Sequence, residues 1–394
     1  MRLDRRTLLA GLAATPLAGC GSMPRLSMPS LSMPSMAMPS VPFMRTPLVE
    51  EKDWGRLADG QTVTLFTLTN TRGSQARVMT WGGILQSLKM PDRDGRMAEV
   101  VLGLDTLADY VERSRNFGST VGRYAGRIAG GRFELDGREV RLDVGTSPHS
   151  THGGPIGFAK RNLMGRTDVT DEGPGVVLTL VSADGDQGFP GRLTISVTYR
   201  LTHDDRLTID YLALTDRATV LNPTNHSYFN LSGDPERLIL DHAFQIEADA
   251  FAAYAPDKIV TGDLAPVAGT PFDFRTAKPI GRDLFEVNEQ LRIGGGYDHS
   301  FAVRGQGLRR AGRLSDAFSG RAMDVWTTEP SLHVYTANTV ELVGRGGAAY
   351  RPHCGVALET QHYQNSPNRP SFPSTVLRPG ETFRSRTECR FSAG

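Results

Sequence analysis

The chain is 394 residues long, and its 44 lysines and arginines nearly balance 43 aspartates and glutamates, which leaves a formal net charge of +1. Balanced charge gives no strong attraction to nucleic acid or to another polyanion, so we expect no nucleic-acid partner. Three cysteines are too few for a disulfide scaffold, and no CxxC or HExxH spacing indicates a dedicated metal site. The length allows one large all-β domain or two ordinary domains.

Residues 1–19 are predicted to be an export signal rather than part of the fold. Arg5 and Arg6 precede an apolar stretch over residues 7–19 that is too short to span a bilayer. The arginine pair resembles a twin-arginine signal, although an ordinary export signal stays open, and "LAGC" resembles the lipobox of bacterial lipoproteins. We therefore expect a lipid on Cys20 that anchors an exported, periplasmic protein, with the outer membrane slightly favoured because aspartate does not follow the cysteine. The alternative is a buried N-terminal helix, which the clustered arginines disfavour.

Residues 20–47 form a low-complexity segment. Met-Pro pairs begin at Met23, Met28, Met33 and Met38 with serine around them, and proline at that density prevents a helix or a central strand. The segment is predicted to be a linker between the lipid anchor and one folded domain over residues 48–394.

From about residue 48 the sequence is rich in predicted strands. In "RLTISVTYRLTHDDRLTIDYLAL", apolar residues alternate with polar ones on both sides of "HDDR", which predicts an antiparallel hairpin. Helical periodicity is scarce, and "TLADYVERS" is the best candidate for a helix. Many strands without intervening helices favour an all-β fold, a large antiparallel β-sandwich. Further short runs predict strands at "VTLFTLTN", "ARVMTW", "GRFELDG", "GVVLTLVSA", "LHVYTANTV" and "GVALETQ".

Polar residues that catalysis or binding would use occur in five separate stretches: "GRYAGRIAGGRF", "HSTHGGPIGF", "TNHSYFNL", "GGGYDHSF" and "GVALETQHYQNSPN". Each stretch alone also fits an ordinary loop or surface strand. Glu359 is the most informative, because Val356 and Leu358 point to one face of a predicted strand while Glu359 points to the other. That face is either a solvated surface or the wall of a polar site, where an acid and a histidine would flank a small ligand.

Taken in order, these stretches resemble aldose 1-epimerases, also called galactose mutarotases. "GDQGFPGRLTISVTYRL", "VYTAN" and "ALETQHYQNSPNRPSFPSTVLRPGETF" extend the resemblance to roughly residues 50–392. Several long motifs in a fixed order are far more specific than any one of them. The resemblance implies a single antiparallel β-sandwich with a sugar site on its concave face. It also implies exchange of the α and β anomers of a hexose, such as galactose or glucose, without a cofactor.

The resemblance assigns roles to five residues. His226 of "TNHSYFNL" falls on the acid of the family, and Glu359 of "LETQ" falls on its base. Arg127, His152 and Asp298 fall on sugar-binding positions. The carboxylate takes the proton of the C1 hydroxyl while the imidazolium protonates the ring oxygen, and the sugar ring opens. The two groups exchange roles when the ring closes.

Three positions depart from the usual family pattern and concern the sugar-binding rim. Gly126 stands where many members have asparagine, Thr151 where leucine is usual, and His333 where some members present glutamine to the sugar. The preferred sugar is therefore left open.

Two other functions also stay open at this point. A non-catalytic carbohydrate-binding lipoprotein would keep the sandwich without needing both His226 and Glu359. A polysaccharide hydrolase or lyase would act on the same sandwich, but hydrolysis commonly uses two carboxylates. The sequence also leaves open whether Cys354 and Cys389 form a disulfide in an oxidising compartment.

Overall fold

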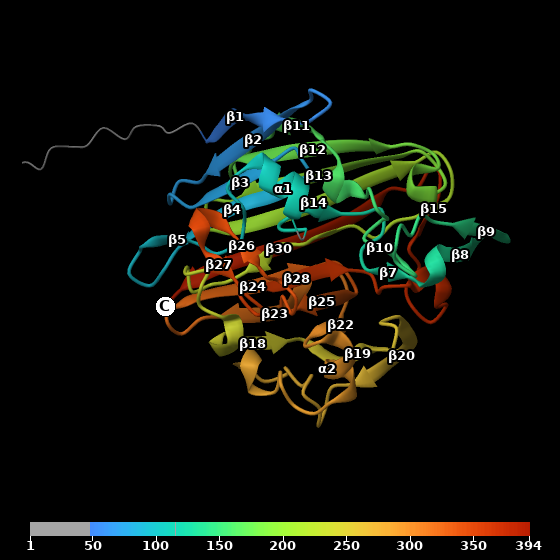
Figure 1. The fold of residues 1–394 in the computed structure, drawn as a ribbon. Coiled ribbons are helices and arrows are strands. Elements are labelled where there is room, and N and C mark those ends of the chain that lie inside the picture. Colours follow the sequence, from blue (N-terminus) through green and yellow to red (C-terminus); the bar gives the residue numbers. More distant parts are fainter. Residues whose placement is uncertain (1–47, 115) are drawn as a thin grey trace, which may run out of the picture. The chain divides into compact units, whose positions relative to one another are not determined.

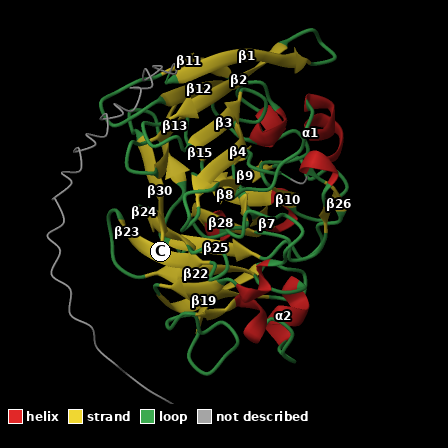
Figure 2. Cartoon of the chain, turned by 90° about the vertical axis from the view of Figure 1, so that its left-hand side faces the viewer, coloured by secondary structure: helices red, strands yellow, loops and turns green. Residues whose placement is uncertain are grey.

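The computed structural model describes residues 48–114 and 116–394 of the chain. The predicted export signal, the predicted lipidation site Cys20 and the predicted linker therefore lie outside the described residues. Strands make up most of the regular structure, and the helical segments are few and short (Figure 2). The predicted all-β fold is confirmed.

The largest sheet has nine antiparallel strands and is continuous across much of the molecule (Figure 1). Apolar residues alternate along its central strands, which places one face of the sheet in the core. In sheet order, its strands are β11 (Met164–Thr167), β12 (Gly175–Ser182), β13 (Leu193–Leu201), β14 (Arg206–Thr215), β30 (Phe383–Ala393), β24 (Arg321–Thr327), β23 (Arg309–Ser315), β18 (Ala243–Ile246) and β21 (Lys278–Pro279).

Two smaller antiparallel sheets pack against the inner face of this sheet. One hydrophobic core joins all three, with Val197 of the large sheet, Phe66 of the first smaller sheet and Leu358 of the second among its members. The first is β1 (Val49–Arg56), β2 (Thr62–Thr69), β3 (Gln75–Met79), β4 (Ile84–Pro91) and β5 (Met97–Glu99). The second is β17 (Tyr228–Phe229), β28 (Val356–Gln361), β25 (Ser331–Tyr335), β22 (Asp298–Val303), β19 (Ala248–Tyr254) and β20 (Val260–Pro266).

Short elements connect the sheets. The described residues form two α-helices, α1 (Leu107–Arg113) and α2 (Glu289–Gly294). Two-stranded ladders pair β6 (Thr120–Val121) with β16 (Thr224–Asn225), β7 (Arg127–Ile128) with β10 (Ser150–Thr151), β8 (Arg132–Leu135) with β9 (Arg138–Arg141), β15 (Thr219–Val220) with β29 (Val376–Leu377), and β26 (Leu342–Val343) with β27 (Ala349–Tyr350). Single 3₁₀ turns occur at Ala129–Gly131, Phe158–Lys160, Asp186–Gly188, Ile239–Asp241, Ile280–Arg282, Arg345–Gly347 and Ser366–Asn368.

The predicted hairpin is confirmed as β13 and β14, which pair along their full length from Leu201↔Leu207 outward. The Thr202 hydroxyl accepts the Arg206 N–H at 2.9 Å and donates to Asp204 at 2.6 Å, so the "HDDR" turn is closed by its own side chains. The predicted helix is α1. It begins with a capping box, in which Thr106 and Asp109 each accept the other's backbone N–H.

The two described cysteines do not form a disulfide. Cys354 and Cys389 are both buried free thiols, and they belong to two different hydrophobic clusters. Burial raises the pKa of the Cys354 thiol to about 11 and that of Cys389 to about 12, which keeps both thiols protonated and unreactive. The disulfide that the sequence left open is therefore absent from the fold.

Candidate active site

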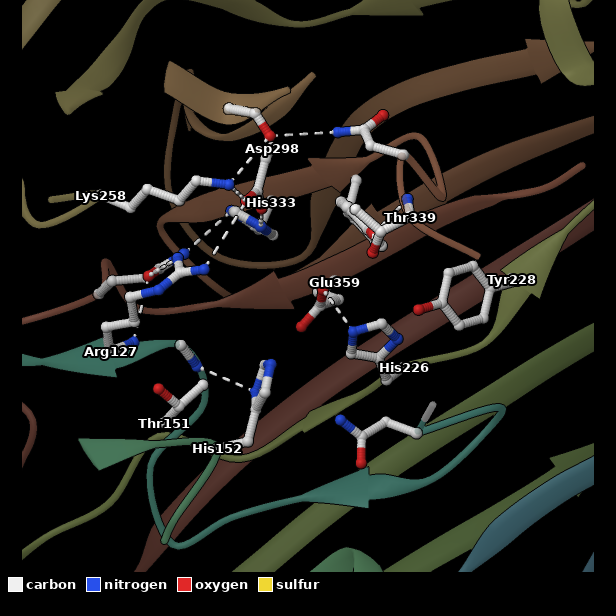
Figure 3. Close-up of a pocket in the computed structure, with 16 residues that line it drawn as sticks. Arg127, Thr151, His152, His226, Tyr228, Lys258, Asp298, His333, Thr339 and Glu359 are labelled. Carbon is white, nitrogen blue, oxygen red and sulfur yellow. Dashed lines mark hydrogen bonds and ion pairs between the residues drawn. The ribbon is translucent and has the colours of Figure 1, made fainter. Parts of the chain in front are cut away.

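A polar pocket of about 260 Å³ lies on the face of the six-stranded sheet that points away from the core. The five residues singled out in the sequence, Arg127, His152, His226, Asp298 and Glu359, all line it (Figure 3). They come from segments that are up to 232 positions apart, as the numbers of the first and last show. The fold therefore brings all five of these residues together in one pocket.

Strand register explains how the pocket wall formed by β22, β25 and β28 is built. Ser300 of β22, His333 of β25 and Glu359 of β28 are directly opposite one another on three neighbouring strands. Directly opposed residues in an antiparallel sheet point to the same face. The intervening residues, such as Val334 and Leu358, lie in the hydrophobic core. The alternation predicted for β28 is thus confirmed, but the face that carries Glu359 is a pocket wall and not a solvated surface.

Glu359 and His226 lie side by side in the pocket. His226 is held between the short strands β16 and β17, where its N–H donates to Ser119 O and its C=O accepts from Gly118 N, both at 2.9 Å. Its Nε2 is 3.4 Å from Glu359 Oε1, which is longer than a usual N–H···O bond. The two residues are 5% and 2% exposed.

Each member of this pair also has a buried atom without a hydrogen-bond partner among the described residues, His226 Nδ1 and Glu359 Oε2. Leaving such an atom unpaired costs about 1–3 kcal/mol, so a fold tolerates it mainly where the group serves another purpose. A buried carboxylate and imidazole with free capacity in one pocket are suited to proton transfer with a ligand.

Asp298 lies on β22 and is fixed by its neighbours. His333 Nε2 is 3.0 Å from Asp298 Oδ1, and Ser300 Oγ is 3.0 Å from His333 Nδ1, which together form a buried chain of three polar side chains. Burial would raise the pKa of the Asp298 carboxyl, but the hydrogen bond and charge of His333 and the charge of Arg127 outweigh it and lower the pKa to about 2. Asp298 is therefore an ionised acceptor at any physiological pH.

His152 enters the pocket from the end of the β7–β10 ladder. Its N–H donates to Gly126 O at 2.9 Å, and its Nδ1 accepts the Gly126 N–H at 3.3 Å. Enclosure by the pocket walls and the positive charges of His226 and Arg127 lower the pKa of His152 well below its ordinary value. The neutral ring carries its proton on Nε2, because Nδ1 is an acceptor, so His152 is a hydrogen-bond donor to a ligand.

Arg127 is held by Gln364. The Gln364 Oε1 accepts from Arg127 N at 3.1 Å, and the Gln364 amide donates to Tyr254 OH at 3.0 Å. The guanidinium then extends toward Asp298, with 3.8 Å between Arg127 Nη2 and Asp298 Oδ2. Gln364 belongs to the "HYQNSPN" stretch that the sequence placed beside Glu359, but no local pattern marked it as the support of Arg127.

The structure explains one of the three positions that depart from the usual family pattern, Gly126. Gly126 has φ +73°, and a Cβ there would lie 2.3 Å from Gln364 Cγ. A side chain at this position therefore requires another placement of Gln364. Thr151 and His333 also line the pocket. His333 contacts Asp298 rather than standing alone at the rim.

Gly126→Ala is expected to lower kcat/KM about tenfold or more, because it displaces Gln364 and with it the guanidinium of Arg127. The matched control is Gly137→Ala, since Gly137 has φ +74° and open space around its Cα. Both variants acquire the same backbone strain, and only the first disturbs the pocket. Equal activities of the two variants in a steady-state assay would contradict this role of Gly126.

Within residues 48–114 and 116–394, no helix is both long enough and apolar enough to cross a membrane. In the same part of the chain, histidine, cysteine and carboxylate side chains nowhere gather in a group of three or more that would hold a metal ion.

The chain is similar in sequence and in structure to aldose 1-epimerases and galactose mutarotases. The sequence profile described as aldose 1-epimerase matches residues 64–390. The galactose mutarotase of Homo sapiens is 39% identical over 338 residues, which cover 84% of this chain and 95% of that protein. The aldose 1-epimerase of Escherichia coli K12 is 39% identical over 340 residues, covering 85% and 97%. Among solved structures, galactose 1-epimerase from Lactobacillus acidophilus superposes with a TM-score of 0.78 at 28% identity, covering 88% of this chain and 99% of that one.

Proposed function

Because the chain belongs to the aldose 1-epimerase family, an isomerase family, we propose that it exchanges the α and β anomers of galactose, glucose and related aldohexoses. The observation that supports this most directly is the buried pair of Glu359 and His226, 3.4 Å apart in a polar pocket, each with an unpaired atom. The partner is a monosaccharide, and the residues themselves supply the acid and the base.

Glu359 is the base of the proposed reaction and His226 is the acid. The Glu359 carboxylate takes the proton of the C1 hydroxyl while the protonated His226 gives a proton to the ring oxygen, and the C1–O5 bond breaks to give the open-chain aldehyde. Rotation about the C1–C2 bond exposes the other face of C1. The O5 hydroxyl then returns its proton to His226 and attacks C1, while Glu359 returns its proton to O1. Both residues end in their starting state.

The other three residues hold the sugar and stabilise charge. His152 donates from Nε2 to a sugar oxygen, and Asp298 accepts a sugar hydroxyl at Oδ2, because Oδ1 is already bonded to His333. Arg127 donates to oxygens between these two. Donors and acceptors fixed in advance on rigid strands lower the cost of orienting the sugar.

The test is anomer exchange of freshly dissolved α-D-galactose and α-D-glucose, followed by polarimetry and by ¹H NMR of the anomeric protons. We expect exchange well above the buffer rate, saturating with sugar concentration. A folded protein that binds galactose without accelerating exchange would instead be the carbohydrate-binding protein. Release of new reducing ends from oligosaccharides would indicate a hydrolase.

We also propose that the protein is an exported lipoprotein whose folded domain begins near residue 48. The support is the sequence of residues 1–47, with its paired arginines, its "LAGC" and its Met-Pro repeats. The family profile begins only at residue 64, so the family likeness does not involve this segment. Lipid on Cys20 would place the sugar site in the periplasm, tethered to a membrane.

Cys20→Ser is expected to move the protein from the membrane fraction to the soluble periplasmic fraction of a bacterial host, because a serine cannot carry the thioether-linked lipid. The specific activity per folded molecule should stay within about twofold, since Cys20 lies outside the family match. Fractionation followed by immunoblotting measures the first effect. A variant that stayed wholly with membranes would contradict the lipidation.

A further inference from the structure

The wall of the pocket that carries Asp298 has more positive charge than a neutral sugar requires. Lys258 Nζ and Arg127 Nη2 approach Asp298 Oδ2 to 3.9 and 3.8 Å, while Oδ1 is bonded to His333. Figure 3 shows Lys258 and Arg127 on the side of the pocket away from His226. Charge-assisted hydrogen bonds are about 2.7–2.9 Å long, so Asp298 engages neither cation fully.

Lys258 is directed into the pocket by the turn that joins β19 to β20. It has φ +62°, a left-handed conformation that is uncommon for lysine, and its N–H donates to Ala255 O at 2.9 Å. One N–H of its ammonium group donates to Gly294 O at 3.2 Å. An ammonium group has three donors, so Lys258 retains donor capacity toward the pocket beyond that bond.

The charges of the lining residues do not balance during the reaction. The pocket holds two cationic side chains, Arg127 and Lys258, and two carboxylates, Asp298 and Glu359. Ring opening starts from a protonated His226, so these five side chains carry a surplus of one positive charge even without any charge on His333. The surplus remains after His226 has given its proton to the ring oxygen, because Glu359 has then taken the proton of O1. A neutral hexose leaves this surplus uncompensated, whereas a sugar with one negative charge compensates it.

We propose that the site also accepts hexuronic acids such as galacturonate and glucuronate, with Lys258 and Arg127 binding the C6 carboxylate. This proposal rests on the anomer exchange proposed above. In this binding mode O1 and O5 contact Glu359 and His226, and C6, which extends from C5 on the ring edge opposite C1 and C2, faces the wall that carries the two cations. The guanidinium of arginine can bind a carboxylate with two parallel N–H donors, and the ammonium group of lysine adds a compact positive charge. Lys258 is then a specificity-determining residue of the same reaction.

The experiment compares kcat/KM for α-D-galacturonate and α-D-galactose at pH 7 and low ionic strength, in the wild type, Lys258→Met and the control Lys160→Met. Lys160 is an exposed lysine outside the lining of the pocket, so its variant removes the same charge without touching the site. We expect saturable exchange of both sugars by the wild type. Lys258→Met should lower the ratio of the galacturonate to the galactose value about tenfold or more, mainly through KM, and Lys160→Met should leave the ratio within about twofold.

Three results would overturn the inference. Wild-type exchange of galactose without any saturable exchange of galacturonate would show that the site rejects the carboxylate. An equal loss for both sugars in Lys258→Met would show that Lys258 only positions Asp298. A higher kcat/KM for galactose 6-phosphate than for galacturonate would assign the cations to a phosphate group instead. Failure of the wild type to exchange galactose itself would refute the proposed function, so the two failures are distinguishable.

Discussion

Glu359→Gln is expected to lower kcat for galactose about 10²- to 10⁴-fold, the range that general acid–base catalysis contributes, with KM changed far less. The amide keeps the size and the hydrogen-bonding reach of the carboxylate, but it cannot take the proton of the C1 hydroxyl. Glu359 is 2% exposed on strand β28, which fixes its carboxylate in the wall of the pocket. The substitution therefore removes stabilisation of the transition state and leaves sugar binding largely unchanged.

The measurement is steady-state anomer exchange together with thermal unfolding, and Glu388→Gln is the matched control. Glu388 is another buried strand glutamate, and it accepts from Arg386 and Arg390 at 2.9 Å each, away from the pocket. That variant should lose stability and keep kcat, whereas Glu359→Gln should lose kcat and keep a cooperative unfolding transition. If Glu359→Gln kept a near-normal kcat and bound the sugar normally, Glu359 would not be the catalytic base.

Local patterns in the sequence identified the β13–β14 hairpin, several further strands and the direction in which Glu359 points, but they did not identify β22, β23, β24 or β30. The alternation in β13, β14 and β28 is a property of each segment alone, and packing of one strand face against the hydrophobic core enforces it. The five pocket residues were found in another way. Each was ambiguous in isolation, and the fixed order of long motifs selected them, because a site made from distant segments leaves no periodic signal within any one of them.

Strand order and long-range register were beyond the sequence patterns. β22 and β25 are neighbours in the six-stranded sheet, yet β23 and β24 lie between them in the chain and belong to the nine-stranded sheet. Nothing in the alternation of these strands says which sheet each one joins. The chain of Ser300, His333 and Asp298 depends on that pairing, so His333 was noticed only as a departure from the family pattern.

Lys258 and Gln364 were missed for a related reason. A lysine in a turn is ordinarily a solvated surface charge, and the left-handed conformation of Lys258 that directs it inward is set by the hydrogen bonds of the β19–β20 turn. Gln364 gains its role only because Arg127 and Tyr254 come to it from distant segments. Such supporting residues are visible only once the tertiary contacts are known.

The double variant His226→Asn, Glu359→Gln is expected to be little slower than the slower of the two single variants. His226→Asn alone should cost about 10²- to 10⁴-fold in kcat, because asparagine cannot protonate the ring oxygen. Proton loss at O1 and proton gain at O5 occur in one coordinated step, and the two side chains are only 3.4 Å apart, so removal of either already disables the step that the other assists. Independent residues would multiply their losses instead. A double variant slower than both singles by a further factor of about 10² would mean that Glu359 and His226 act in separate steps, and stepwise proton transfer would replace the coordinated mechanism.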